Sequence, residues 1–115
     1  MKKVILVMLL FLLLVGCTEE KFFDERVLGS WDETHNMIFT FDKEMKLTVY
    51  DGYEYLEYDY WFENETFVID WKDDGTIGAY GVTVYDYEVR KAGSYEFFVL
   101  RIDNADRVLM SRLLE

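Results

Sequence analysis

The sequence contains no proline, one cysteine and one histidine among its 115 residues. A single cysteine excludes an internal disulfide and any zinc site built from cysteines. A single histidine needs a nucleophile and an orienting partner for catalysis, and no serine or cysteine motif supplies them. His35 also lies in the polar stretch 32–36, which is typical of an exposed turn. We therefore expect no enzymatic activity, no metal site and no cofactor.

Positive charge is also scarce, with 12 Lys and Arg against 23 Asp and Glu and a net charge of −11. Affinity for nucleic acids comes mainly from Lys and Arg contacts with phosphates, so we expect no nucleic-acid partner. The chain is 51% hydrophobic and 18% aromatic, which excludes a disordered acidic chain. Its length suits one domain.

The first sixteen residues have the pattern of a secretory signal. A basic start, Met1-Lys2-Lys3, precedes an unbroken apolar run over residues 4–15. A helix of that length is too short to span the roughly 30 Å of bilayer hydrocarbon, whereas it suits the core of a signal peptide.

The end of this run, Leu14-Val15-Gly16-Cys17, resembles the lipobox of bacterial lipoproteins. The resemblance implies a signal helix over residues 1–16 that is removed, and acyl chains on Cys17 that bind the membrane. Residues 17–25 would then be the lipidated cysteine and its tether. The protein would lie in the cell envelope, on the extracytoplasmic side of a bacterial membrane, with the choice of membrane open. Removing the leader leaves 99 residues and takes the net charge from −11 to −13. The alternative is an ordinary secretory signal followed by an unrelated cysteine.

The rest of the chain alternates polar and apolar residues between short turn clusters, which predicts many half-buried strands. Asp51-Gly52 is a strong hairpin signal. The pattern of residues 95–102 leaves their inward face open, and 108–114 could form a strand or a terminal helix. We predict strands over 27–33, 37–41, 46–50, 55–62, 66–72, 82–90, 95–102 and 108–114. About eight strands at this spacing indicate an all-β sandwich or a small antiparallel up-and-down β-barrel, and we favour the barrel.

Two motifs resemble lipocalin-like families of small bacterial lipoproteins: Leu28-Gly29-Ser30-Trp31, and the strand and turn over residues 38–42. Segments 100–102 and 109–112 are similar to the last two strands of those families. The resemblance implies a barrel domain over residues 26–115. It also implies that Trp31 plugs one end, that Gly29 allows close backbone approach, and that Arg112 or Arg101 covers the Trp31 ring.

The same resemblance implies binding of a small apolar or amphipathic ligand. Alternation places the candidate lining residues on the inward face: Phe39, Phe41, Leu56, Tyr58, Tyr60, Phe67 and Ile69. The alternative is a ligand-free module that binds an envelope protein through an acidic, Tyr-rich surface. On that surface we expect Tyr55 and Trp61 to point outward with Glu57 and Asp59. A faint calcium-loop pattern begins at Asp70, but its third position is Lys72, so we expect a solvated turn there.

Overall fold

The computed structural model describes residues 22–72 and 80–114, and nearly all of their regular structure is β. A short 3-10 helix, η1 (Glu25–Val27), precedes the strands. The strands are β1 (Gly29–Glu33), β2 (Ile38–Phe41), β3 (Lys46–Tyr50), β4 (Tyr55–Glu63), β5 (Thr66–Asp70), β6 (Val82–Ala92), β7 (Tyr95–Ile102) and β8 (Ala105–Leu113).

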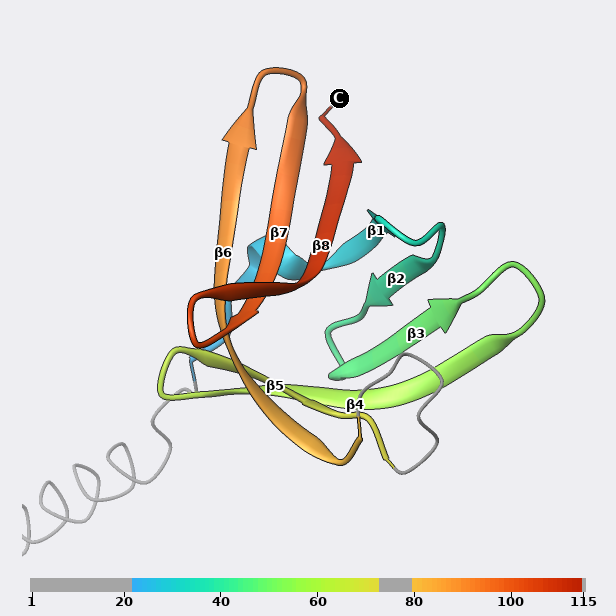
Figure 1. The fold of residues 1–115 in the computed structure, drawn as a ribbon, viewed down its shortest axis with the longest axis vertical. Helices are drawn as coiled ribbons and strands as arrows, with labels where there is room; N and C mark the ends of the chain where they lie inside the picture. Colours follow the sequence, from blue (N-terminus) through green and yellow to red (C-terminus); the bar gives the residue numbers. More distant parts are fainter. Residues whose placement is uncertain (1–21, 73–79, 115) are drawn as a thin grey trace, which may run out of the picture.

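Each strand pairs antiparallel with the next, and β8 returns to pair with β1, so the sheet closes into a barrel (Figure 1). The predicted all-β, eight-stranded barrel is therefore confirmed, and it fits a small lipocalin-like barrel. Closure removes the exposed strand edges that a β-rich, proline-free chain would otherwise present. The seam is short, because only Asp32 and Glu33 of β1 have partners on β8.

Six of the eight strands differ in their bounds from the predictions, and only β3 and β7 have the predicted ranges. The strand predicted from residue 27 begins only at Gly29, because Asp24 caps η1 by accepting a hydrogen bond from the Arg26 backbone N–H. The last segment is a strand and not a helix, since it pairs with β7 from Leu113 back to Ala105.

The hairpins use the expected turn residues. Asn64-Glu65 and Asp103-Asn104 are two-residue connections in which both residues have positive φ. That backbone matches the right-handed twist of the flanking strands. Gly52 in the β3–β4 connection also has a positive φ, of 100°, as the Asp-Gly signal predicts.

The two ends of the barrel are built differently. One end carries η1 and the β2–β3, β4–β5 and β6–β7 turns, and we call it the η1 end. The other end carries the β1–β2, β3–β4, β5–β6 and β7–β8 connections, and we call it the loop end. Antiparallel order places these connections alternately, so every strand joins the two ends.

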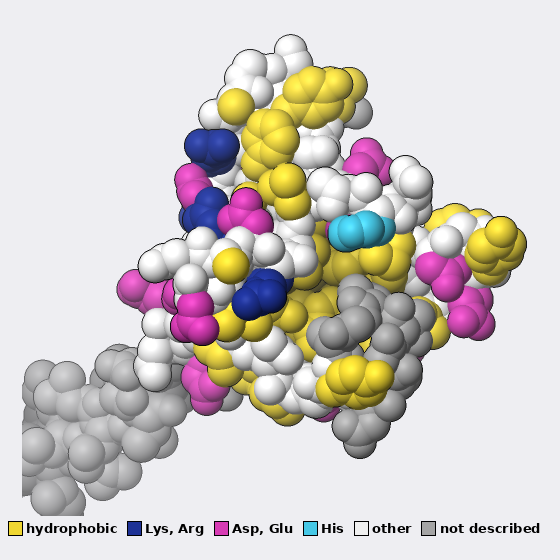
Figure 2. All heavy atoms as spheres, viewed as in Figure 1, with side chains coloured by type: hydrophobic (Ala, Val, Ile, Leu, Met, Phe, Trp, Pro, Cys, Tyr) yellow, Lys and Arg dark blue, Asp and Glu magenta, His cyan; other side chains and the backbone are white. Residues whose placement is uncertain are grey.

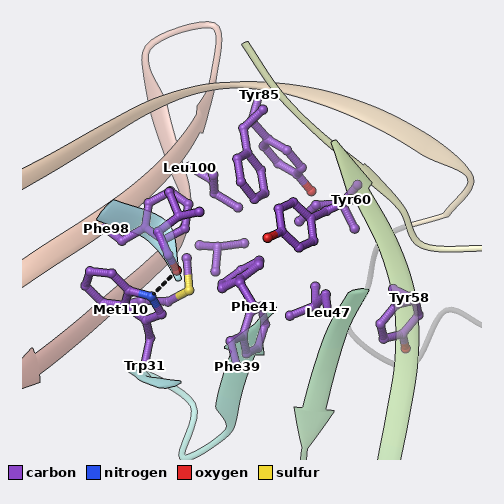
Figure 3. Packing of buried hydrophobic residues seen from close by; sticks show 14 of the residues in the cluster. Trp31, Phe39, Phe41, Leu47, Tyr58, Tyr60, Tyr85, Phe98, Leu100 and Met110 are labelled. Atoms are coloured by element: carbon purple, nitrogen blue, oxygen red, sulfur yellow. Dashed lines mark hydrogen bonds between the residues drawn. The ribbon is translucent and has the colours of Figure 1, made fainter. Parts of the chain in front are cut away.

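Aromatic side chains fill the barrel interior (Figure 3). Phe41 lies among four other rings, with centroid distances of 5.1 Å to Tyr60, 5.5 Å to both Phe67 and Phe98, and 6.3 Å to Phe39. On β7, whose inward face the pattern left open, Glu96, Phe98 and Leu100 alternate inward and are buried. Val99 is also buried, which explains why the pattern of that strand is apolar on both faces.

Candidate functional site

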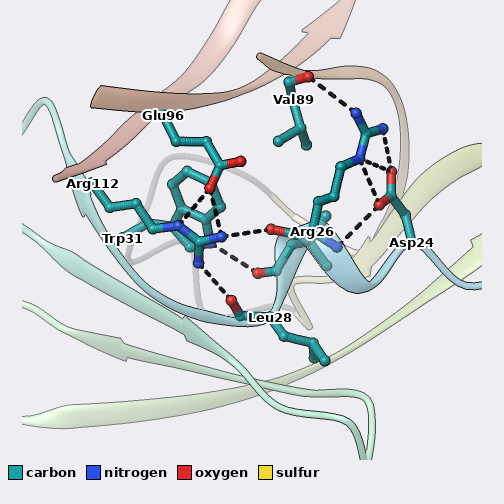
Figure 4. Close-up of polar contacts among 8 residues, drawn as sticks. Asp24, Arg26, Leu28, Trp31, Val89, Glu96 and Arg112 are labelled. Carbon is teal, nitrogen blue, oxygen red and sulfur yellow. Dashed lines mark hydrogen bonds and ion pairs between the residues drawn. The ribbon is translucent and has the colours of Figure 1, made fainter. Parts of the chain in front are cut away.

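Trp31 closes the η1 end of the barrel (Figure 4). It is 1% exposed, and its indole Nε1–H donates to the Val27 carbonyl oxygen at 2.8 Å. The guanidinium carbon of Arg112 lies 3.9 Å from the ring centroid, a cation–π contact. Of the two arginines that the resemblance offered, Arg112 therefore covers Trp31, whereas Arg101 pairs with Glu88 and Asp106.

The Arg112 guanidinium also links β8 to the η1 segment, beyond the short seam between β1 and β8. Its Nη1 donates to the Leu28 carbonyl at 2.6 Å, and its Nη2 donates to the Arg26 carbonyl at 2.9 Å. Its Nε donates to the buried carboxylate of Glu96 at 2.9 Å, directly across the β7–β8 ladder. A Cβ at Gly29 would lie 3.1 Å from Nη1, so glycine permits this close approach.

Asp24 links the segment before η1 to the barrel through hydrogen bonds. Its carboxylate accepts from the Arg26 side chain, at 2.6 Å for the shortest contact, and from the Tyr87 hydroxyl at 2.9 Å. The hydrogen bond from Arg26 is the main reason that the pKa of Asp24 lies below its usual value. Burial, and then donation to Asp24, raises the pKa of Tyr87. The η1 end is thus held by two arginine–carboxylate pairs.

The seven predicted ligand-lining residues all lie on the inward face. Leu56 is partly buried and packs against the core, and the other six are at most 1% exposed. Their rings contact one another, as Tyr60 and Phe67 do by stacking at 5.3 Å. Within the described residues, every buried side-chain nitrogen and oxygen has a hydrogen-bond partner. The interior therefore offers apolar surface and no unpaired polar group.

Trp71, the first residue after β5, reaches across the interior at the loop end. Its ring lies 5.1 Å from Tyr58 and 6.3 Å from Phe39, and its Nε1–H donates to the Tyr85 hydroxyl at 2.7 Å. Burial raises the pKa of Tyr85. Three partly buried apolar side chains pack on the core near this end: Met37, Leu56 and Ile102. In Figure 2, hydrophobic side chains lie beside His35.

His35 lies in the β1–β2 turn, as its polar surroundings predict. Its side chain is 77% exposed, and its Nδ1 lies 2.6 Å from Oε1 of Glu33, whose side chain is 3% exposed. Glu33 also accepts from the His35 backbone N–H at 2.9 Å, so the carboxylate caps the turn.

Two tyrosines near the tip of the β3–β4 hairpin, Tyr53 and Tyr55, point outward, whereas Tyr58 and Tyr60 farther along β4 are buried. Tyr53 is 96% exposed and Tyr55 is 72% exposed, and the Tyr55 ring stacks on Tyr50 at 4.6 Å. Trp61 also lies on the outer face of β4 but is only partly exposed. It borders a surface groove of about 490 Å³, lined by Phe22, Trp61, Phe62, Glu63, Asn64 and Glu65.

Some predictions concern residues outside the described ranges. Cys17 and the signal helix are among them, as are Asp73 and Gly75 of the faint calcium pattern. Across residues 22–72 and 80–114, no group of three or more His, Cys, Asp or Glu is placed to hold a metal ion, and no helix is long and apolar enough to cross a membrane.

Three contributors were missed by sequence reasoning: Glu96, Asp24 and Trp71 in its position across the loop end. The inward position of Glu96 depends on strand register, which the apolar pattern of β7 conceals. Asp24 before a Glu-Arg pair carried a detectable signal, because Asp is a preferred N-cap residue.

Comparison with known proteins found no matching family model, no matching curated protein and no matching solved structure.

Proposed function

We propose that this protein is a lipoprotein of the bacterial cell envelope, anchored through acyl chains on Cys17, whose barrel binds a small apolar or amphipathic ligand. The closed eight-stranded barrel is the framework for this proposal. Partly buried apolar side chains pack on the core at both ends, and the ends differ in that Trp31 and Arg112 close the η1 end.

The observation that carries the ligand proposal is the partly buried apolar surface at the loop end. Met37, Leu56 and Ile102 lie there against an interior that is mainly apolar and aromatic. The η1 end is closed by Trp31, Arg112 and Glu96. A ligand therefore enters at the loop end, where the Trp71 ring must move to admit it. Recognition would depend on shape and apolar area, since each buried CH₂ contributes about 0.8 kcal/mol.

Native mass spectrometry of the barrel domain that follows Cys17, produced without the anchor and purified gently, tests this proposal. We expect a reproducible extra mass that disappears on denaturation. Leu56→Trp should remove the extra mass by filling the loop end from inside. Tyr55→Trp is the matched control, since it adds an indole one residue away on the outer face, and the extra mass should persist. A clean ligand-free mass for the wild-type protein would refute the ligand proposal.

Anchoring is tested separately by metabolic labelling with a fatty acid. The wild-type chain should incorporate the label, and Cys17→Ala should abolish incorporation and release or mislocalise the protein. Label on the Cys17→Ala chain would contradict the assignment of the anchor.

The exposure of Tyr53 and Tyr55 favours a second function, binding of an envelope protein. Exposed aromatic rings among carboxylates suit a partner with a basic surface. In this case Tyr55→Ala should leave the unfolding midpoint unchanged and should weaken crosslinking to the partner in intact cells. Unchanged crosslinking would remove support for this function.

A further inference from the structure

We propose that the groove beside Trp61, together with Phe22, is the surface by which the barrel contacts a zwitterionic lipid bilayer. This inference rests on the proposed anchor at Cys17. It assigns an orientation: the η1 end faces the membrane, and the loop end, with its apolar entrance, faces away from it.

The first step is the position at which the chain enters the described structure. Phe22 is the first described residue, and its ring packs edge-on against Phe62 at 5.4 Å. Phe62 lies near the end of β4, beside the β4–β5 turn at the η1 end. Four residues lie between Cys17 and Phe22, so the two are five Cα–Cα steps apart. An extended chain spans at most about 3.6 Å per residue, so the acylated cysteine lies within roughly 18 Å of this corner.

The second step is the chemistry of the surface at this corner. Phe22 is 44% exposed although it is a large apolar residue, and Trp61 is partly exposed on the outer face of β4. Both line the same groove of about 490 Å³. An indole has an apolar body and one N–H donor, and tryptophan is enriched where membrane and water meet.

The exposed apolar surface does not continue from Trp61 across the sheet. Val68, opposite Trp61 on β5, is fully buried although it lies on the outer face. Val84, opposite Val68 on β6, is 51% exposed but is separated from the groove by Val68. The contact surface is therefore limited to the groove and Phe22.

The charges around the groove select the kind of bilayer. Glu63 and Glu65 line it, and the chain as a whole has a net charge of −11. An anionic lipid surface would repel these carboxylates. A zwitterionic surface accepts the aromatic rings without that repulsion, so we assign a zwitterionic bilayer as the partner.

Acidic residues limit the contact along β4. Between Trp61 and Tyr55 the outer face of this strand carries Asp59 and Glu57. The barrel cannot lie flat on that side without pressing these carboxylates toward the bilayer. Tyr55 and Trp61 are six residue steps apart along β4, or about 20 Å, which keeps Tyr55 in water when Trp61 reaches the lipid.

In the full-length lipidated protein, the intrinsic fluorescence of Trp61 can report its contact with the bilayer. Trp31 and Trp71 are 1% and 0% exposed, so Trp61 is the accessible member of the three tryptophans. The experiment places the protein in phosphatidylcholine vesicles whose acyl chains are brominated near the headgroup, and compares its fluorescence with that in unbrominated vesicles. We expect bromine to quench part of the emission, and Trp61→Phe should abolish that loss. Trp61→Phe/Tyr55→Trp places an indole at the other end of the same outer face, and its emission should not be quenched.

Flotation of the same samples separates the two proposals. Protein that floats with the vesicles but is not quenched refutes the membrane contact while the anchor stands. Quenching that persists in Trp61→Phe, or that is equal for the indole at position 55, also refutes the proposed orientation. Protein that does not float refutes the anchor, and the membrane contact is refuted with it. Vesicles containing phosphatidylglycerol should weaken the quenching, and stronger quenching there would refute the zwitterionic assignment.

Discussion

Removal of the Arg112 guanidinium should strongly destabilise the barrel, because this group makes three kinds of contact at once. It covers the Trp31 ring, donates to two backbone carbonyls and pairs with buried Glu96. The Arg112 side chain is 26% exposed, so its interactions are only partly screened by water.

The magnitude follows from what Arg112→Met leaves behind. Removing one partner of a buried ion pair costs about 3–5 kcal/mol, and the partial exposure of Arg112 places this pair near the lower limit. The cation–π contact contributes about 1 kcal/mol. These contributions overlap, so we expect a loss of about 3–4 kcal/mol in the free energy of unfolding. For a domain of this size, the melting temperature should fall by about 12 °C or more.

The assay is urea-induced unfolding of the barrel domain, followed by tryptophan fluorescence and circular dichroism. Arg101→Met is the matched control, because Arg101 pairs with carboxylates whose side chains are 41% and 56% exposed. Such surface pairs contribute about 1 kcal/mol at most. In the Arg112→Met chain, Glu96→Gln should restore about 1–3 kcal/mol of the free energy of unfolding, because it removes the buried carboxylate that has lost its arginine partner. A loss for Arg112→Met no larger than that for Arg101→Met would refute the reasoning, as would the absence of any rescue by Glu96→Gln.

Two further predictions concern the same end of the barrel. Gly29→Ala forces an alanine into φ +107° and brings its Cβ to 3.1 Å from Arg112, whereas Gly52→Ala has a similar φ of +100° and no neighbour within 4 Å. Both substitutions should lower the urea midpoint, since a strained φ costs about 1–3 kcal/mol. An equal fall in the midpoint for the two would show that Arg112 does not need the space left by the missing Cβ at Gly29. Asp24 has a lowered pKa in the folded protein, so its stabilisation is present above the unfolded value of 3.8 and is lost as the pH falls through the folded value. In thermal melts from pH 7 to pH 2, the melting temperature of Asp24→Asn should fall less steeply with acid than that of the wild type. Parallel plots of melting temperature against pH for the two proteins would contradict this account.

The sequence by itself determined the alternation of the strands and most of the turns. Residues 46–50 and 95–102 are strands with the predicted bounds, and Asp51-Gly52 lies in a hairpin connection. These features depend on neighbours within a few residues, where side-chain period and allowed φ act directly. The role of Trp31 as a plug was predicted differently, from the resemblance of Gly29-Ser30-Trp31 to lipocalin-like families.

Only the tertiary structure decided which residues meet across the barrel. Arg101 and Arg112 are indistinguishable as covers for Trp31 until the register of β7 and β8 is known. A register shift at Leu100 and Arg101 leaves Arg112 opposite Glu96 and above the Trp31 ring. The position of Trp71 across the interior likewise depends on closure of the whole sheet. Such contacts join residues far apart in the chain, and a local pattern carries no information about the register and closure that bring them together.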